Sequence, residues 1–189
     1  NHTFPASSFI LEPGEAISVG GFYDWIDPTR IQIELSGMTS GLYQVWLTYQ
    51  ANPDNYLPIV LSMTIDGVLP YQEATQGSLD TYWVEADDTV RQDRYGNDVS
   101  VLKATYDDFI RKTLKDPNRL YTEGLLVYLT PTNLTLELEK ISGALKLQAI
   151  ELSPLQALPT YAEYLPNGSM VEVGNHRFEA EDMFLMNHS

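Results

Sequence analysis

Strict alternation of apolar and polar residues in two neighbouring segments is the feature that most constrains the fold of this chain. The segments span residues 41–49 and 59–65. Because successive side chains of a strand point to opposite faces, every second residue of each segment faces the same way. The expected inward sets are Tyr43, Val45, Leu47 and Tyr49, and Ile59, Leu61, Met63 and Ile65. This pattern predicts antiparallel sheet with one buried face.

Further signals extend the strand pattern along the chain. Asp66-Gly67 follows the second segment, and both residues tolerate the positive φ of a tight turn, so we expect the strand to reverse there. Four more short segments predict strands: 31–35, 125–129, 134–138 and 145–152. The apolar phase changes within the last of these, which predicts a β-bulge near Gln148-Ala149.

One short helix is expected over residues 105–115. Thr105 and Asp108 are spaced like a helix cap, and Tyr106, Ile110 and Leu114 form an apolar stripe. A parallel sheet needs a helix between most of its strands, whereas this pattern offers one. The predicted fold class is therefore all-β, an antiparallel β-sandwich of jelly-roll type with one inserted short helix.

The chain is longer than one sandwich requires, with 189 residues. We expect the sandwich over residues 1–154 and a linker over 155–175. Residues 176–183 loosely echo residues 8–16, so 176–189 are interpreted as the first strand of a truncated second domain. The alternative is a chance match between two short acidic segments.

Composition restricts the partners. The net charge of −15 and the isoelectric point near 4.3 argue against nucleic acid, because phosphate binding depends on Lys and Arg. Neutral glycans and divalent cations are compatible with an acidic surface. No apolar run approaches the roughly 18 residues that cross a bilayer, so we expect no direct membrane insertion. The absence of cysteine excludes disulfides and thiolate sites.

An ordered series of short motifs covers about two thirds of the chain. Its members are Gly41-Leu-Tyr, Ile65-Asp-Gly, Pro70-Tyr-Gln-Glu-Ala, Asp93-Arg-Tyr-Gly-Asn-Asp, the turn Leu114-Lys-Asp, Gly124-Leu-Leu-Val-Tyr-Leu, Ile150-Glu-Leu and Pro159-Thr-Tyr-Ala-Glu-Tyr-Leu. This series resembles the accessory galactose-binding-like domain of large bacterial extracellular solute-binding proteins, of the Gram-positive type that serves sugar ABC transporters.

The resemblance implies a galactose-binding-like jelly roll in an extracellular protein, associated with the cell surface through its parent. Phe178–Asp182 further resembles the opening strand of carbohydrate-binding jelly rolls. Two departures matter: Val99-Ser100-Val101 stands where the motif series has a proline, and nothing resembles the two-lobed solute-binding domain. The resemblance therefore implies an accessory module and not the transport receptor itself. The chain begins at Asn1 without a leader segment, which leaves open a signal peptide in the parent protein.

Catalytic patterns are weak. Asp87-Asp88 and Asp107-Asp108 are adjacent carboxylates, which point apart on a strand or a helix and do not form a facing acid and base. The three histidines, His2, His176 and His188, lie outside the expected core of the sandwich. No phosphate-binding glycine loop or nucleophile elbow is present. We expect a protein that is not an enzyme.

Calcium is the candidate cofactor, because Asp93, Asn97 and Asp98 gather hard oxygen ligands around a glycine-directed turn. The same residues are common in ordinary turns. The resemblance to carbohydrate-binding jelly rolls implies a second place, where Glu12 or Glu15 would meet Glu151.

Aromatic residues supply the sugar hypothesis, because a pyranose packs its C–H faces on Trp or Tyr. The residues considered are Trp25, Trp46, Trp83, Tyr71, Tyr82 and Tyr95. Trp46 lies within a strand and is expected to pack on the sheet, whereas Tyr82 and Trp83 open a polar loop. The predicted ligand-binding residues are Tyr82, Trp83, Tyr95 and Asn97.

These observations favour a non-catalytic module that binds carbohydrate or positions a neighbouring solute-binding domain of the same polypeptide. Two alternatives stay open: a structural spacer without a ligand, and an appended module of a glycoside hydrolase. A spacer predicts no concave aromatic site at an end of the sandwich.

Overall fold

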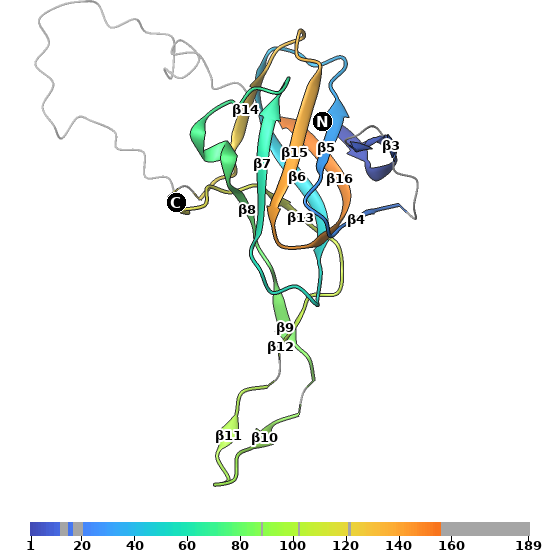
Figure 1. The fold of residues 1–189 in the computed structure, drawn as a ribbon. Coiled ribbons are helices and arrows are strands. Elements are labelled where there is room, and N and C mark those ends of the chain that lie inside the picture. Colours follow the sequence, from blue (N-terminus) through green and yellow to red (C-terminus); the bar gives the residue numbers. More distant parts are fainter. Residues whose placement is uncertain (12–14, 17–20, 88, 102, 121, 156–189) are drawn as a thin grey trace, which may run out of the picture. The chain divides into compact units, whose positions relative to one another are not determined.

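The computed structural model describes residues 1–11, 15–16, 21–87, 89–101, 103–120 and 122–155. Two antiparallel sheets face each other across one hydrophobic core (Figure 1). The first sheet contains β1 (His2–Pro5), β4 (Tyr23–Trp25), β6 (Gly41–Ala51), β13 (Ile110–Thr113), β14 (Leu126–Leu129) and β16 (Leu145–Pro154). The second contains β2 (Ile10–Leu11), β3 (Glu15–Ala16), β5 (Arg30–Glu34), β7 (Ile59–Ile65), β8 (Gly77–Leu79) and β15 (Thr135–Ser142).

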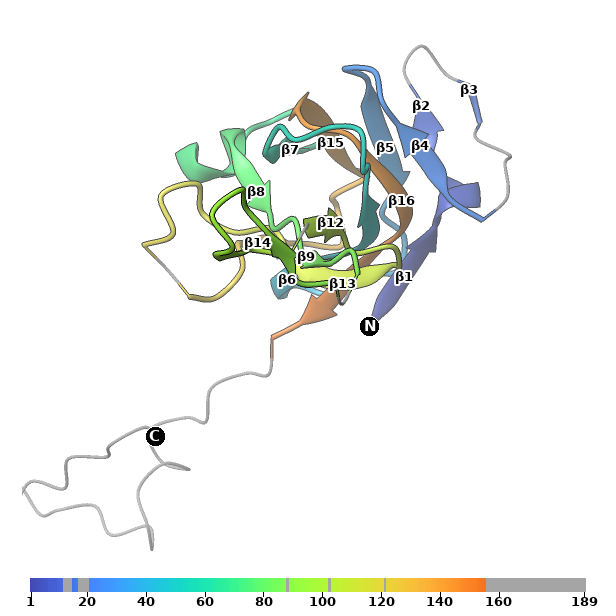
Figure 2. The same ribbon diagram turned by 90° about the horizontal axis from the view of Figure 1, so that it is seen from below.

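Long strands that follow one another in the chain lie in opposite sheets. β5, β7 and β15 belong to the second sheet, whereas β6, β14 and β16 belong to the first. Figure 2 shows these two layers from below, with the core between them. The chain is thus an all-β antiparallel sandwich, as predicted, and its crossovers between sheets are those of a jelly roll.

The alternating segments bury the predicted faces. Tyr43, Val45, Leu47 and Tyr49 of β6 are buried. In β7 every odd-numbered residue from Ile59 to Ile65 is buried, and Ser62 and Thr64 are only partly covered. The side chains of the two strands therefore meet from opposite sheets in one core.

The predicted turn and bulge are confirmed. Asp66 and Gly67 adopt φ values of 50° and 73°, and Ile65 and Val68 exchange backbone hydrogen bonds across the turn. β16 shifts its register against β6 between Leu147 and Ala149, so the change of apolar phase in the sequence marks a real β-bulge.

The helix predicted over residues 105–115 is wrong. Ile110–Thr113 form β13, which pairs with the stretch of β6 from Tyr49 to Trp46. Two features favour the strand: β6 offers a row of backbone groups to pair, and Asp108 binds the backbone N–H of Phe109 with its own carboxylate, at 2.7 Å. The described helices are two short 3₁₀ turns, η1 (Ala6–Ser8) and η2 (Gln72–Thr75).

An arm of residues 82–106 extends from one end of the sandwich (Figure 1). Its inner ladder pairs β9 (Trp83–Glu85) with β12 (Lys103–Thr105), and its outer ladder pairs β10 (Arg91–Gln92) with β11 (Asp98–Val99). A turn closes the tip, where Gly96 has a φ of 82°.

The sandwich is described through Leu155. The linker predicted over 155–175 and the second domain predicted over 176–189 fall on residues 156–189, apart from Leu155, and lie outside the described residues. Among the described residues, no helix combines the length and the hydropathy that crossing a membrane requires.

Candidate functional site

A cleft lies where the base of the arm meets the segment that joins β6 to β7. Its volume is about 380 Å³. The lining residues are Pro53, Tyr56, Trp83, Lys103, Ala104, Thr105 and Asp107. The cleft thus combines residues of the inner ladder of the arm with a loop that is distant in sequence.

Two aromatic rings form one wall of the cleft. Trp83 and Tyr56 stack with their ring centroids 5.8 Å apart and their planes inclined by 6°. At this spacing the rings are offset neighbours, and no sugar ring fits between them. Trp83 is 45% exposed and Tyr56 is 76% exposed, so the pair presents aromatic surface to solvent.

Polar groups surround the aromatic pair. Lys103 binds Glu85 across the inner ladder, with 3.1 Å between Nζ and Oε1. Asp107 accepts a hydrogen bond from Nε2 of Gln50 at 2.6 Å. These contacts hold an ammonium group and a carboxylate beside the rings and fix their orientation. The arrangement suits a polar ligand with apolar faces.

The structure separates the predicted ligand-binding residues into two places. Trp83 lines the cleft, and Tyr82 lies next to it with Nζ of Lys112 5.0 Å from its ring centroid. Tyr95 and Asn97 belong to the turn at the tip of the arm, and Figure 1 shows that turn beyond β10 and β11. Tyr95 is 73% exposed, and its ring contacts Arg94.

Trp25 and Trp46 do not contribute to the cleft. Trp25, considered among the sugar-binding aromatics, lies in β4 and is fully buried, so its ring is not open to a ligand. Trp46 packs on the outer face of β6, where the guanidinium of Arg111 lies 3.9 Å from its ring centroid. That position agrees with the predicted packing on the sheet.

Asp93 organises the tip of the arm. Its Oδ1 accepts the backbone N–H groups of Tyr95 and Asn97 at 2.7 and 3.0 Å, and its Oδ2 accepts the side-chain amide of Asn97 at 3.0 Å. The hydrogen bond from the Asn97 side chain, followed by those from the backbone, lowers the pKa of Asp93. The residues predicted as calcium ligands therefore close a turn with their own hydrogen bonds.

The other predicted calcium ligands either bind protein side chains already or are not fully described in the structure. Asp98 accepts a hydrogen bond from Gln92 at 3.1 Å. Arg111 donates to both carboxylate oxygens of Glu151 at 2.8 Å, so a cation at Glu151 would compete with this guanidinium. Glu12 lies outside the described residues, and Glu15 is described only in its backbone pairing. In the described part of the chain, no three His, Asp or Glu residues gather closely enough to hold a metal.

Sequence reasoning missed the partner of Trp83. Tyr56 lies in the loop Asn52-Pro-Asp-Asn-Tyr56, which reads as an ordinary turn. An aromatic residue directly after such a turn signal was the available clue, but nothing in the sequence places that loop beside residue 83. Asp107 was missed as a cleft residue because a helix was expected from residue 105 onward, and no sequence signal pointed to Lys103.

No protein-family model matches the chain, and no curated protein matches it. Among solved structures, one neighbour is the Podospora anserina GH26-CBM35 β-(1,4)-mannanase, with 14% sequence identity and a TM-score of 0.47. The match covers 84% of this chain and 28% of that chain, so this chain spans less than a third of the length of the mannanase. The assignment as a β-sandwich follows from the two sheets themselves.

Proposed function

We propose that this domain is an extracellular, non-catalytic accessory module that binds carbohydrate in the cleft beside Trp83 and Tyr56. The stacked, solvent-facing aromatic pair is the observation that carries the proposal. Aromatic faces pack against the C–H faces of a pyranose, and the neighbouring Lys103, Thr105 and Asp107 supply partners for sugar hydroxyls.

The non-catalytic role is proposed on the sequence, which offers adjacent carboxylates that point apart and no nucleophile elbow.

The parent protein is proposed on the motif series alone. Its resemblance favours an accessory domain of a large solute-binding protein of a sugar ABC transporter. An appended module of a glycoside hydrolase is the alternative parent. In either parent the cleft would hold glycan near the neighbouring domain.

A second candidate function, the positioning of a neighbouring domain, is favoured by the arm. The exposed apolar residues of its described part include Trp83, Val84, Val90, Tyr95 and Val99. A surface of this kind suits contact with another domain of the same polypeptide. Under this candidate the arm would bind protein and the cleft would bind no glycan.

Replacement of Trp83 by Ala tests the proposal. The purified domain and its variants would be applied to a glycan array with and without calcium, and the affinity for the best glycan would then be measured by calorimetry. We expect Trp83→Ala and Tyr56→Ala each to weaken binding by more than about 1 kcal/mol, as expected for exposed aromatic anchors. Tyr95→Ala is the matched control, because it removes an exposed aromatic ring outside the cleft.

Four outcomes contradict the proposal in different ways. Equal glycan affinity of Trp83→Ala and the parent chain would exclude the cleft. Loss of folding in Trp83→Ala would make that residue structural. The absence of any glycan ligand would favour domain positioning, and an effect of calcium would identify a metal-dependent site instead of the aromatic pair.

A further inference from the structure

One face of the inner ladder of the arm belongs to the cleft. In this ladder Trp83 lies opposite Thr105, and Glu85 lies opposite Lys103. Because successive side chains of a strand point to opposite faces, these four side chains project from the same face of the ladder. Trp83, Lys103 and Thr105 line the cleft. The cleft face therefore continues from the aromatic pair to Glu85 and Lys103, one step farther along the arm.

The two positions on this face are spaced like neighbouring sugars of a chain. A strand rises about 3.3 Å per residue, so residues 83 and 85 lie about 6.6 Å apart along β9. One pyranose of an extended, β-1,4-linked chain advances by a comparable distance, whereas an α-1,4-linked chain coils away from a straight ladder. An extended glycan with one sugar on Trp83 thus brings its next sugar to Glu85 and Lys103.

The second position offers accessible polar groups. Nζ of Lys103 lies 3.1 Å from Oε1 of Glu85, and the two side chains are 53% and 57% exposed. The ammonium group donates hydrogen bonds and the carboxylate accepts them, so the pair can bind both kinds of atom of a sugar hydroxyl. An exposed ion pair of this kind adds little to stability, which leaves both groups free to bind a ligand.

The charges of the cleft disfavour acidic sugars. Among the described residues that line it, the charged ones are Lys103 and Asp107. The charge of Lys103 is compensated by Glu85, whereas Asp107 is bonded to the neutral amide of Gln50. The cleft thus keeps an uncompensated carboxylate, in a chain whose net charge is −15. A uronic acid or a sulfated sugar would be repelled both at long range and in the cleft.

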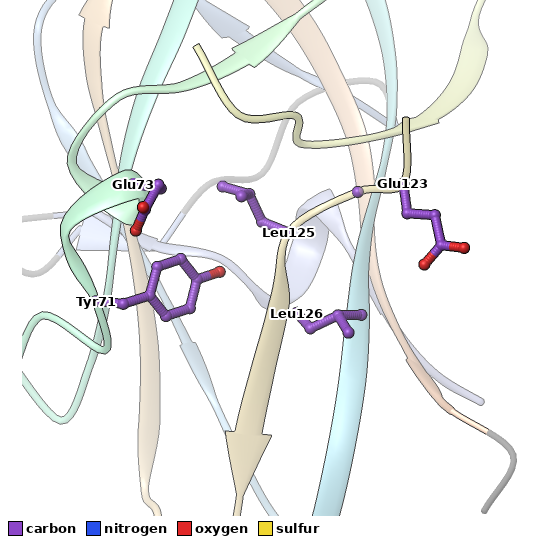
Figure 3. Close-up of a pocket in the computed structure, with 6 residues that line it drawn as sticks. Tyr71, Glu73, Glu123, Leu125 and Leu126 are labelled. Carbon is purple, nitrogen blue, oxygen red and sulfur yellow. The ribbon is translucent and has the colours of Figure 1, made fainter. Parts of the chain in front are cut away.

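A second cavity lies between η2 and the start of β14 and offers no place of this kind (Figure 3). Its volume is about 310 Å³, and no residue lines both this cavity and the cleft. The hydroxyl oxygen of Tyr71 is buried without a hydrogen bond to any described residue, so a ligand in the cavity does not reach it. Figure 3 shows the carboxylates of Glu73 and Glu123 on opposite sides of Leu125 and Leu126. These polar groups do not converge on one ligand, and sugar binding is therefore assigned to the cleft.

We propose that the cleft binds an extended, linear glycan without acidic groups and covers at least two consecutive sugars of that chain. One sugar packs on the stack of Trp83 and Tyr56, and the next one forms hydrogen bonds with Glu85 and Lys103. This inference rests on the proposed glycan function of the cleft, and it names the ligand as a chain instead of a single terminal sugar.

A length series of oligosaccharides tests the inference. The probes are β-1,4-linked oligomers of glucose, mannose, galactose and xylose with one to four units, followed through the indole N–H of Trp83 by NMR. In the series that binds, the affinity should rise about tenfold from the monosaccharide to the disaccharide. Maltotetraose, which is α-1,4-linked, and tetragalacturonic acid, which is acidic, should each bind at least about tenfold more weakly than the best neutral tetrasaccharide.

A double variant removes the second position without leaving an unpaired charge. Glu85→Gln combined with Lys103→Met should weaken binding of the tetrasaccharide about fivefold and leave binding of the monosaccharide unchanged. Its melting temperature should stay the same, because the pair is exposed. Asp87→Asn combined with Arg91→Met is the matched control, since it removes another exposed ion pair of the arm, and it should bind the tetrasaccharide like the parent chain.

The outcomes separate this inference from the proposed function. Equal affinity for the monosaccharide and the tetrasaccharide, with binding lost in Trp83→Ala, would overturn the inference and leave the glycan function of the cleft intact. Tighter binding of tetragalacturonic acid or maltotetraose, or full tetrasaccharide binding by the Glu85→Gln and Lys103→Met variant, would also overturn it. Absence of binding by every sugar of the panel and of the glycan array would overturn the proposed function together with this inference.

Discussion

The sandwich and the arm are built from the same antiparallel ladders but differ in what covers them. In β7 buried and partly buried residues alternate along the whole strand. In β9, β10 and β11 every residue is exposed. The sandwich has a second sheet that covers its inner face, whereas the described part of the arm is a two-stranded ribbon without a second layer. An isolated two-stranded ribbon is at best marginally stable in water, so the arm depends on the sandwich to which it is attached.

This difference separates stability from recognition in the molecule. Burial in the core supplies the free energy of folding, and the residues that do this are inaccessible to ligands. The base of the arm can leave Trp83 exposed because little of the stability depends on it. The aromatic cleft therefore lies at the junction, where the rigid sandwich holds Tyr56 beside the ribbon.

The largest expected effect contrasts one residue of each region. Leu61→Ala removes a fully buried side chain of β7 and should lower the free energy of unfolding by about 2 to 5 kcal/mol. Val84→Ala removes a 40% exposed side chain of β9 and should change the free energy of unfolding by less than about 0.5 kcal/mol. Urea denaturation followed by tryptophan fluorescence measures both. Similar losses in the two variants would mean that the arm belongs to the cooperative core.

Two glycines with positive φ, one in the sandwich and one in the arm, extend the comparison to the backbone. At Gly143, with a φ of 77°, an added Cβ would meet Cα of Ile59 at 2.8 Å and the carbonyl oxygen of Pro58 at 2.9 Å. At Gly96, with a φ of 82°, it would meet nothing within 4 Å. Gly143→Ala should therefore destabilise the fold by about 1 to 3 kcal/mol, whereas the strain in Gly96→Ala stays in the tip of the arm. The denaturant concentration at the midpoint of unfolding measures the loss of stability in each variant. A larger decrease of the midpoint in Gly96→Ala than in Gly143→Ala would contradict this expectation.

Asp66 in the sandwich and Asp93 in the arm each accept hydrogen bonds in a turn, and we expect them to respond differently to acid. Asp66 accepts hydrogen bonds from the side chain of Asn133 and from the backbone of Leu134 and Thr135, and chiefly the Asn133 contact lowers its pKa below 3.8. A lowered folded-state pKa means that its stabilisation is present above this value and disappears as the pH falls through the folded pKa. With allowance for solvent screening, the contribution is on the order of 1 kcal/mol.

The measurement compares acid unfolding of the Asp66→Asn and Asp93→Asn variants from about pH 5 to about pH 2. Asp66→Asn should lose less stability with acid than the parent chain, because its side chain cannot be protonated in this range. The pKa of Asp93 is also lowered, by its bonds with Asn97 and Tyr95, but its protonation should open only the tip of the arm. A global change of acid stability in Asp93→Asn would refute that separation.

The smallest expected effect comes from shortening the arm. Glu85 and Lys103 lie directly opposite each other, so residues 86–102 can be replaced by Asn-Gly, which forms a two-residue hairpin loop. The free energy of unfolding should change by less than about 0.5 kcal/mol, and glycan binding should persist because Trp83 and Tyr56 remain. Loss of binding in the shortened chain would place the ligand on the outer arm, at Tyr95 and Asn97.

The sequence by itself determined the parts of the fold that depend on local periodicity. Alternation identified both faces of β6 and β7, Asp66-Gly67 identified the turn, and the change of phase near Gln148 identified the bulge. These features are readable because a strand repeats every two residues and because positive φ restricts the choice of residue.

Only the tertiary structure decided which segments meet. Tyr106, Ile110 and Leu114 form a helical stripe in the sequence, but pairing with β6 decided for a strand over residues 110–113. The stack of Trp83 on Tyr56 joins residues 27 positions apart, and the cavity at Tyr71 joins two segments about 50 positions apart. Such contacts depend on how the two sheets face each other and where the arm leaves them, and no local pattern in the chain records that geometry.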